Sequence, residues 1–274
     1  MTATDPLPPA ATVALLWLVF GGAHVGLASA RVRAALVARL GEGGFLALFS
    51  AVAAVWFGAL VSYYATHRFA GAPGLALGRF AGARLVLMSL AVAGVTLTFL
   101  MDYAKSPSAL FKPPVRAPRG VERVTRHPFF VGVALLASAH LLLATRLVGT
   151  VFFAGLAALA ILGAWHQDRK LLARRGAPYA GYLAVTSAVP FAAIVARRQR
   201  LAWREIPPRG LVLGLAVAAA LRAVHASIFA HGGAWVIGVV LAGAALSAGR
   251  AWRRAQRLAA TPPGAAAASS SLRR

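Results

Sequence analysis

Seven long apolar stretches constrain the fold of this chain more than any other feature of its sequence. A helix needs about 20 apolar residues to cross the hydrocarbon core of a bilayer, and here stretches of that kind are separated by short loops rich in arginine. They lie at residues 11–30, 43–66, 82–103, 128–146, 148–166, 209–230 and 233–252. The pattern predicts an all-α, polytopic transmembrane helix bundle of about seven spans.

Composition agrees with this prediction and limits the class of partner. Hydrophobic residues make up 59% of the 274-residue chain, and its mean hydropathy is +0.72. A formal net charge of +23 is also common in nucleic-acid-binding domains. Here, however, the basic residues stand at the ends of the apolar stretches, where lysine and arginine anchor helices in a membrane. We therefore expect membrane lipids as partners and no nucleic acid.

The distribution of basic residues also predicts the orientation of the chain. If the N-terminus lies outside, the inner loops and tail hold 24 of the 29 lysines and arginines, and the outer side holds four. This asymmetry predicts an outer N-terminus and a cytoplasmic C-terminus. The first ten residues lack a basic region typical of a secretory signal peptide, so we expect the first apolar stretch to remain as a helix.

Residues 1–257 are expected to form a single integral membrane domain, and residues 258–274, rich in Pro, Ala and Ser, a disordered tail. Four prolines in residues 105–127 predict an ordered or extended cytoplasmic loop. Residues 178–196 are apolar but are interrupted by Pro190. They predict an interfacial or re-entrant element rather than an eighth span.

Two histidines, His24 and His140, lie well inside their apolar stretches, and the chain has no cysteine to act as a ligand. His24 lies among glycines that thin the first helix, so that a backbone or a flat ligand can approach. His24 is expected about 20 Å below the outer end of its span, and His140 about 18 Å above the inner end of the fourth. Both would then lie inside hydrocarbon, within roughly 10 Å of each other in depth.

A histidine at such depth is a candidate functional residue. The alternative is a structural role, with a hydrogen bond to Ser29 or Ser138 or to a backbone carbonyl. Since neutral imidazole binds metals and haem iron well, two histidines on different helices leave a shared ligand and structural pairing equally open. For His67, His225 and His231, near the outer ends of their helices, we favour interfacial anchoring over an outer metal or proton site.

A second candidate site begins at the inner end of the fourth stretch. Pro128 suits the first helical position, and Arg126 and His127 precede it near the helix N-terminus, where an anion or a carboxylate binds well. The alternative is a positively charged membrane anchor. A downstream group is expected to pack against this loop; it comprises Asp168, Gly176, Tyr179, Tyr182 and Pro190.

The chain resembles the NnrU family, membrane proteins named for their association with nitrite and nitric oxide reduction in denitrifying bacteria. Four stretches carry the resemblance: Gly22-Ala23-His24 with Ser29, Arg39–Glu42, Thr125–Leu142 and Ser187–Ala193. Plant and algal zeta-carotene isomerases, which hold haem b between two histidines and isomerise a cis double bond, resemble this family too. The resemblance therefore implies haem b with His24 and His140 as iron ligands. Ala137 stands where the isomerases have a cysteine offered as an alternative ligand, so ligand exchange is not implied.

The resemblance implies a protein of the bacterial inner (plasma) membrane, acting in nitrite and nitric oxide (denitrification) metabolism or in carotenoid-type cis–trans isomerisation. Arg126 and His127 would pair with a haem propionate or an anionic headgroup. One alternative is a non-catalytic assembly protein for a respiratory or denitrification complex. Another is a membrane methyltransferase, because the chain is distantly similar to isoprenylcysteine and phospholipid methyltransferases. That similarity lies in the order of Arg126, His127, Pro128, Gly132, Asp168, Leu171, Leu172, Gly176, Tyr179, Tyr182 and Pro190, with Gln167-Asp168 in place of two glutamates.

Overall fold

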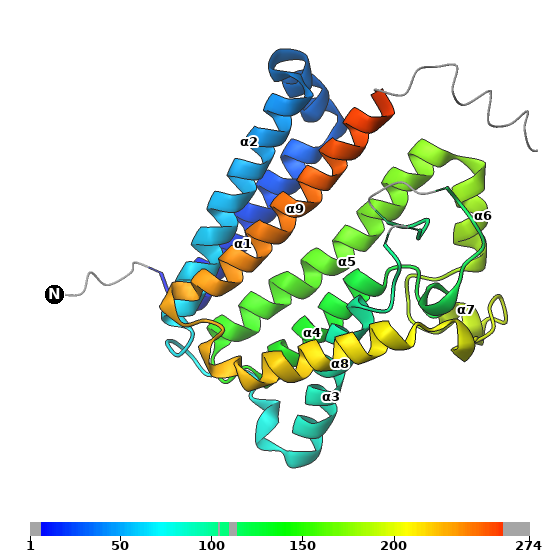
Figure 1. Ribbon diagram of the computed structural model, residues 1–274. Coiled ribbons are helices and arrows are strands. Elements are labelled where there is room, and N and C mark those ends of the chain that lie inside the picture. Colours follow the sequence, from blue (N-terminus) through cyan, green and yellow to red (C-terminus); the bar gives the residue numbers. More distant parts are fainter. Residues whose placement is uncertain (1–6, 104, 110–113, 260–274) are drawn as a thin grey trace, which may run out of the picture.

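A computed structural model describes residues 7–103, 105–109 and 114–259, and within these ranges the chain is helical, with no strand (Figure 1). The α-helices are α1 Pro9–Ala28, α2 Ala30–His67, α3 Ala81–Thr98, α4 Pro128–Leu143, α5 Leu147–Arg175, α6 Ala177–Val185, α7 Ala192–Val195, α8 Pro208–Ala223 and α9 Ala234–Ala259. Short 3₁₀ turns occupy Leu77–Arg79, Gly120–Arg123, Trp203–Glu205, His225–Ser227 and His231–Gly233. The predicted all-α fold is confirmed.

A helix lies at each of the seven predicted stretches, but the helices differ in length. Within the described residues, four are long and apolar enough to cross a membrane, namely α1, α2 from Arg31 onward, α3 and α5. The apolar segments Pro128–Leu143 and His231–Leu246 are shorter. These long apolar helices support a membrane protein, and the number of crossings and the orientation of the termini stay predictions.

The helices form two groups joined along α5 (Figure 1). In one group α2 packs against both α1 and α9; in the other, α3 packs against α4 and α8, and α4 against α5. The contact of α1 with α5 joins the groups around a buried apolar core, in which Tyr64 of α2 stacks on Phe152 of α5 with ring centroids 4.0 Å apart. This core sets the position of α1 relative to α5.

The contact between α3 and α4 depends on two glycines. A Cβ atom built on Gly94 would lie 2.5 Å from the carbonyl oxygen of Gly132, so no larger side chain fits between the two backbones. Such close approach is typical of helices that pack inside a membrane. It holds α4, which carries His140 and follows His127, firmly against α3.

Three predicted boundaries are wrong. Residues 31–39, expected as a loop, are helical, because this alanine-rich segment favours helix; α2 breaks instead at Gly41, whose φ of 70° suits a residue without a Cβ. Helix α5 continues past residue 166 to Arg175 and stops at Gly176, which also has a positive φ. The sixth predicted stretch, 209–230, ends too late, because α8 already ends at Ala223 and a longer connection leads to α9.

The segments outside the long helices behave largely as predicted. The described parts of residues 105–127 are non-helical apart from the 3₁₀ turn Gly120–Arg123. Residues 178–196 form α6 and α7, both too short to cross a bilayer, while their depth relative to the membrane surface stays a prediction. The predicted disordered tail begins within α9, and its residues 260–274 lie outside the described ranges.

The bundle has two ends, a hairpin end and a loop end. At the hairpin end, the α4–α5 turn binds the segment after α2: the amide of Gly74 donates to the carbonyl of Thr145 at 3.0 Å, and that of Leu147 to Ala72 at 2.8 Å. Gly71 of this segment lies beside Pro9, so α1 begins at the same end. The loop end holds residues 114–127, α6 and the last turns of α5.

Candidate functional site

Asp168, in the last turns of α5, gathers three side chains at the loop end. Arg126 donates to its carboxylate from Nε at 2.9 Å and from Nη2 at 2.6 Å, and His127 Nε2 donates at 2.8 Å. The Tyr179 hydroxyl donates a further hydrogen bond at 2.8 Å. Asp168 is 8% exposed, His127 2% and Tyr179 0%. These four residues, the Asp168 cluster, form a buried and mutually satisfied polar network.

Backbone hydrogen bonds dock the segment before α4 onto the segment after α6. The amide of Arg126 donates to the carbonyl of Ser187 at 2.9 Å. The Thr125 hydroxyl donates to the carbonyl of Ala188 at 2.8 Å and accepts from the amide of His127 at 3.2 Å. These bonds fix the direction in which Arg126 and His127 leave the backbone, and so they present both side chains to Asp168.

The protonation state of Tyr179 suits its role as a donor. Burial, together with the neighbouring Asp168 carboxylate, raises the pKa of the Tyr179 hydroxyl. The hydroxyl therefore keeps its proton and donates a hydrogen bond to the carboxylate. Gly176 makes this contact possible, because its φ of 57° ends α5 and turns α6 back against it.

The Asp168 cluster confirms one prediction made from the sequence, and a second stays a prediction. The predicted packing of Asp168 and Tyr179 against the Arg126–His127 segment is confirmed. The structure gives Arg126 and His127 an internal carboxylate as partner, and their contact with a haem propionate or a lipid headgroup stays a prediction. Sequence reasoning identified the segments involved, but not that Asp168 would be the anion.

Two further carboxylates at this end were missed by sequence reasoning. Glu122 is 3% exposed and pairs with Arg116, with Nη1 2.9 Å from Oε2. Glu205 accepts from Arg123 Nε at 2.9 Å and from the amide of Gly120 at 2.7 Å. These bonds hold the pKa of Glu205 at about 2. The charge composition of the sequence was the signal for these ion pairs. The chain has only six acidic residues and 29 basic ones, so many basic side chains are available to pair with each carboxylate.

His24 lies on α1 between aromatic rings of α1 and α2. Its ring centroid is 5.6 Å from that of Phe20 and 4.8 Å from that of Phe49. Its Nδ1 atom is buried and has no hydrogen-bond partner among the described residues. The close backbone approach expected at the neighbouring glycines does not occur, because no heavy atom lies within 4 Å of a Cβ built on Gly22 or Gly26.

His140 lies on α4 in different surroundings. The Nδ1–H of His140 donates a hydrogen bond to the carbonyl oxygen of Leu136 at 2.8 Å. The ring centroid is 4.9 Å from that of Phe153 on α5 and 5.8 Å from that of His225 after α8. With the proton on Nδ1, the lone pair of the ring is on Nε2, the form in which histidine binds a metal.

His24 and His140 have different neighbours in the structure. His140 packs against Phe153 of α5, whereas on α1 it is Trp17, seven residues before His24, that contacts this part of α5 through the carbonyl of Phe152. His140 lies three residues before the end of α4, and His24 lies in the last turns of α1, and their agreement in depth stays a prediction. Each imidazole has suitable donor chemistry for haem iron, and haem bound by His24 and His140 stays a prediction.

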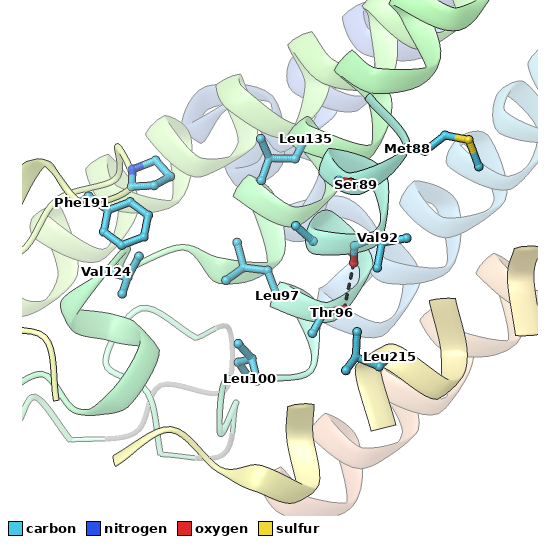
Figure 2. A pocket seen from close by; sticks show the side chains of 12 residues that line it. Met88, Ser89, Val92, Thr96, Leu97, Leu100, Val124, Leu135, Phe191 and Leu215 are labelled. Carbon is cyan, nitrogen blue, oxygen red and sulfur yellow. Dashed lines mark hydrogen bonds between the residues drawn. The ribbon is translucent and has the colours of Figure 1, made fainter. Parts of the chain in front are cut away.

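An apolar pocket of about 610 Å³ lies between α3, α4 and α8 (Figure 2). Its walls are Met88, Ser89, Val92, Ala93, Thr96, Leu97, Leu100, Val124, Leu135, Pro190, Phe191 and Leu215. The Thr96 hydroxyl donates to the carbonyl of Val92 at 2.9 Å, the dashed line in Figure 2. Toward the loop end the pocket reaches Val124, two positions before Arg126. Sequence reasoning missed it, because its residues resemble lipid-facing ones.

Comparison with known proteins agrees with the resemblance seen in the sequence. The chain is 31% identical over 199 residues to the chloroplastic 15-cis-zeta-carotene isomerase of Arabidopsis thaliana, covering 70% of this chain and 53% of that protein. With the protein of the same name from Zea mays it is 29% identical over 193 residues, covering 68% and 51%. It thus spans about half the length of these curated relatives.

No solved structure matches the chain. A family model described as NnrU protein, however, matches residues 12–246, which include α1 through α8 almost entirely, and with them His24 and His140. Since that match covers most of the sequence, the chain belongs to the NnrU family.

Proposed function

We propose that this protein isomerises a cis double bond in a long unsaturated hydrocarbon, in the bacterial inner membrane and with haem b as cofactor. The observation that carries the proposal is the apolar pocket between α3, α4 and α8. The names of the two relatives, both 15-cis-zeta-carotene isomerases, support the reaction and the carotenoid class of substrate.

The shape of the pocket suits a chain-like molecule. Its α3 wall runs from Met88 to Leu97, about 14 Å along the helix axis. A volume of about 610 Å³ is within the usual range for small-molecule sites. Ser89, Val92 and Ala93 on this wall are exposed, so a hydrocarbon dissolved in the bilayer can enter sideways between the helices.

The chemistry of the walls suits a hydrocarbon. Of the two hydroxyls among the lining residues, that of Thr96 is already bonded to a backbone carbonyl, so an apolar molecule does not strip it of a partner. Recognition then depends on shape and dispersion contacts. A cis bond bends a polyene, and a wall of packed helices discriminates between bent and straight molecules.

The haem of this proposal rests on the family resemblance and on the donor chemistry of the intramembrane histidines. Bound haem would supply an iron centre whose properties depend on its axial ligands. The methyltransferase alternative has less support, because Arg126 is already held by Asp168.

The test is conversion of a defined substrate by the purified full chain in lipid nanodiscs, prepared with ample haem. 15-cis-zeta-carotene is incubated with the protein in the dark, and the isomers are separated by chromatography. Val92→Trp fills the pocket and should lower conversion at least tenfold. Val86→Trp is the matched control, because Val86 lies on the same helix, is 58% exposed and does not line the pocket.

Conversion by the wild type and by Val86→Trp, with loss in Val92→Trp, would support the proposal. Absence of conversion in the haem-loaded wild type would contradict it. Equal activity in the two tryptophan variants would mean that the reaction takes place outside this pocket.

A further inference from the structure

A second pocket, of about 320 Å³, lies where α3 begins at the hairpin end. Its walls are Gly78, Arg79, Ala81, Arg84, Leu85 and Met88. Two of these side chains are cationic and two are large and apolar, which is the mixed chemistry of a site for an amphipathic molecule. Met88 also lines the apolar pocket between α3, α4 and α8, so the two pockets are neighbours along α3.

The two arginines of this second pocket have no carboxylate partner among the described residues. The carboxylates that form ion pairs there lie in the first part of α2, just after α3 and at the loop end. The guanidinium of Arg79 lies over the ring of Phe80, with Cζ 4.8 Å from the ring centroid. Both Arg79 and Arg84 are exposed, so their N–H groups are available to an anion from outside the protein.

Backbone contacts hold the segment that carries Arg79 in place. The amide of Ala76 donates to the carbonyl of Ala144 in the α4–α5 turn at 2.9 Å, and a Cβ built on Gly74 would lie 2.5 Å from that same oxygen. Ala76 has a φ of 49°, which is unfavourable for a residue with a side chain and persists only where the surrounding structure imposes it. The fold therefore builds this wall of the pocket before any ligand binds.

The position of the pocket along α3 matches the level of lipid headgroups. Helix α3 is one of those long and apolar enough to cross a membrane, and the pocket surrounds its first two turns. Arginine side chains at the ends of such helices reach the headgroups. Leu85, which is 70% exposed, and Met88 lie farther along the helix, where the acyl chains begin. Cations followed by apolar side chains repeat the order of phosphate and acyl chain in a lipid.

We propose that this pocket binds an anionic phospholipid, with its phosphate between Arg79 and Arg84 and an acyl chain passing Leu85 toward Met88. Guanidinium groups bind phosphate oxygens through charge-assisted hydrogen bonds in a matching planar geometry. Basic side chains near a membrane surface also attract anionic lipids electrostatically. This site lies beside the pocket of the proposed isomerase and does not depend on that reaction.

The test is binding of defined lipids to the purified full chain in detergent, with bound lipid counted by native mass spectrometry. Phosphatidylglycerol, phosphatidylcholine and inorganic phosphate are titrated separately. Phosphatidylglycerol should bind about tenfold more tightly than phosphatidylcholine, because each arginine adds attraction for the net negative charge. In the double variant Arg79→Gln/Arg84→Gln that preference should disappear. Inorganic phosphate should not displace phosphatidylglycerol at equal concentration, because it lacks the acyl chain.

The double variant Arg31→Gln/Arg39→Gln is the matched control. It removes the same charge from two exposed arginines of α2 that line neither described pocket, and it should keep the preference. Elution of each variant as a single species on size exclusion shows that it is folded. A preference that survives in Arg79→Gln/Arg84→Gln, or that is lost equally in the control, would overturn the site. Displacement of the lipid by an equal concentration of inorganic phosphate would overturn the lipid as its ligand.

Discussion

Two histidines of this chain differ in almost every respect. His127, at the loop end, is 2% exposed, and its Nε2 donates to Asp168. His24, inside α1, has a buried Nδ1 without a hydrogen-bond partner among the described residues. A buried imidazole nitrogen therefore has a hydrogen-bond partner at His127, and at His24 it has none among the described residues.

This difference in hydrogen bonding indicates that the loop end has a structural role and that His24 is a candidate functional residue. At the loop end the scarce carboxylates are each placed against arginine: Asp168 with Arg126, and Glu122 with Arg116. Such pairing holds the segment before α4 to α5. A buried polar atom that lacks a partner costs about 1–3 kcal/mol, so its retention inside a membrane helix favours a functional role for His24 or its surroundings.

The largest effect is expected from Asp168→Asn. The substitution keeps the size of the side chain but leaves the charge of Arg126 without its counterion. Removal of one partner of a buried ion pair typically costs about 3–5 kcal/mol. The free energy of unfolding in detergent, followed by circular dichroism, should fall by that amount.

Asp102→Asn is the control for this substitution. Asp102 and Lys105 form an exposed pair 3.5 Å apart, and exposed pairs contribute at most about 1 kcal/mol. If the two asparagine variants were equally stable, the Asp168 cluster would not be the scaffold described above, and the contrast with the membrane histidines would disappear.

An intermediate effect is expected at Glu205 when the pH is lowered. Its folded-state pKa of about 2 is below the usual 4.5 of glutamate, so its contribution to stability is complete above about pH 4.5 and is lost as the pH falls toward 2. The side chain is about one third exposed, so water screens the effect. Cleavage of residues 114–127 by pepsin should accelerate over this interval.

Glu205→Gln should remove most of that acceleration, because glutamine does not titrate. The control is Glu42→Gln, which changes an exposed glutamate in the first part of α2 and should leave the pepsin profile as in the wild type. An unchanged profile in Glu205→Gln would show that another group opens the loop end in acid.

The helices could be predicted from the sequence because apolar runs of sufficient length determine where a chain can span a bilayer. The break at Gly41 and the extension of α5 to Arg175 could not, because alanine-rich and arginine-rich segments are compatible with either helix or loop. The packing of Asp168 against Arg126 followed from charge and motif order. Its geometry depended on the turn at Gly176.

The neighbours of His140 could not be predicted for a different reason. Depth was counted from the ends of apolar runs, and the run containing His140 extends beyond the end of α4 at Leu143. Contacts with the segment after α2 fix where that end lies. The nearness of His225 depends on how the connection after α8 folds, and no periodicity in the sequence records it.

The smallest effect is expected from His24→Phe in the haem-free protein, and it tests the comparison most directly. Phenylalanine keeps the contacts of the ring with Phe20 and Phe49 and removes the unpartnered Nδ1. Stability should therefore stay within about 1 kcal/mol of the wild type or rise slightly. His127→Phe, the matched control, removes a buried donor from Asp168 and should be clearly destabilised in the same unfolding measurement. If both variants lost the same stability, His24 would be as much a part of the scaffold as His127. If only His127→Phe loses stability, the protein folds without the polar atom of His24, and the reason for keeping that atom lies in what the folded protein binds.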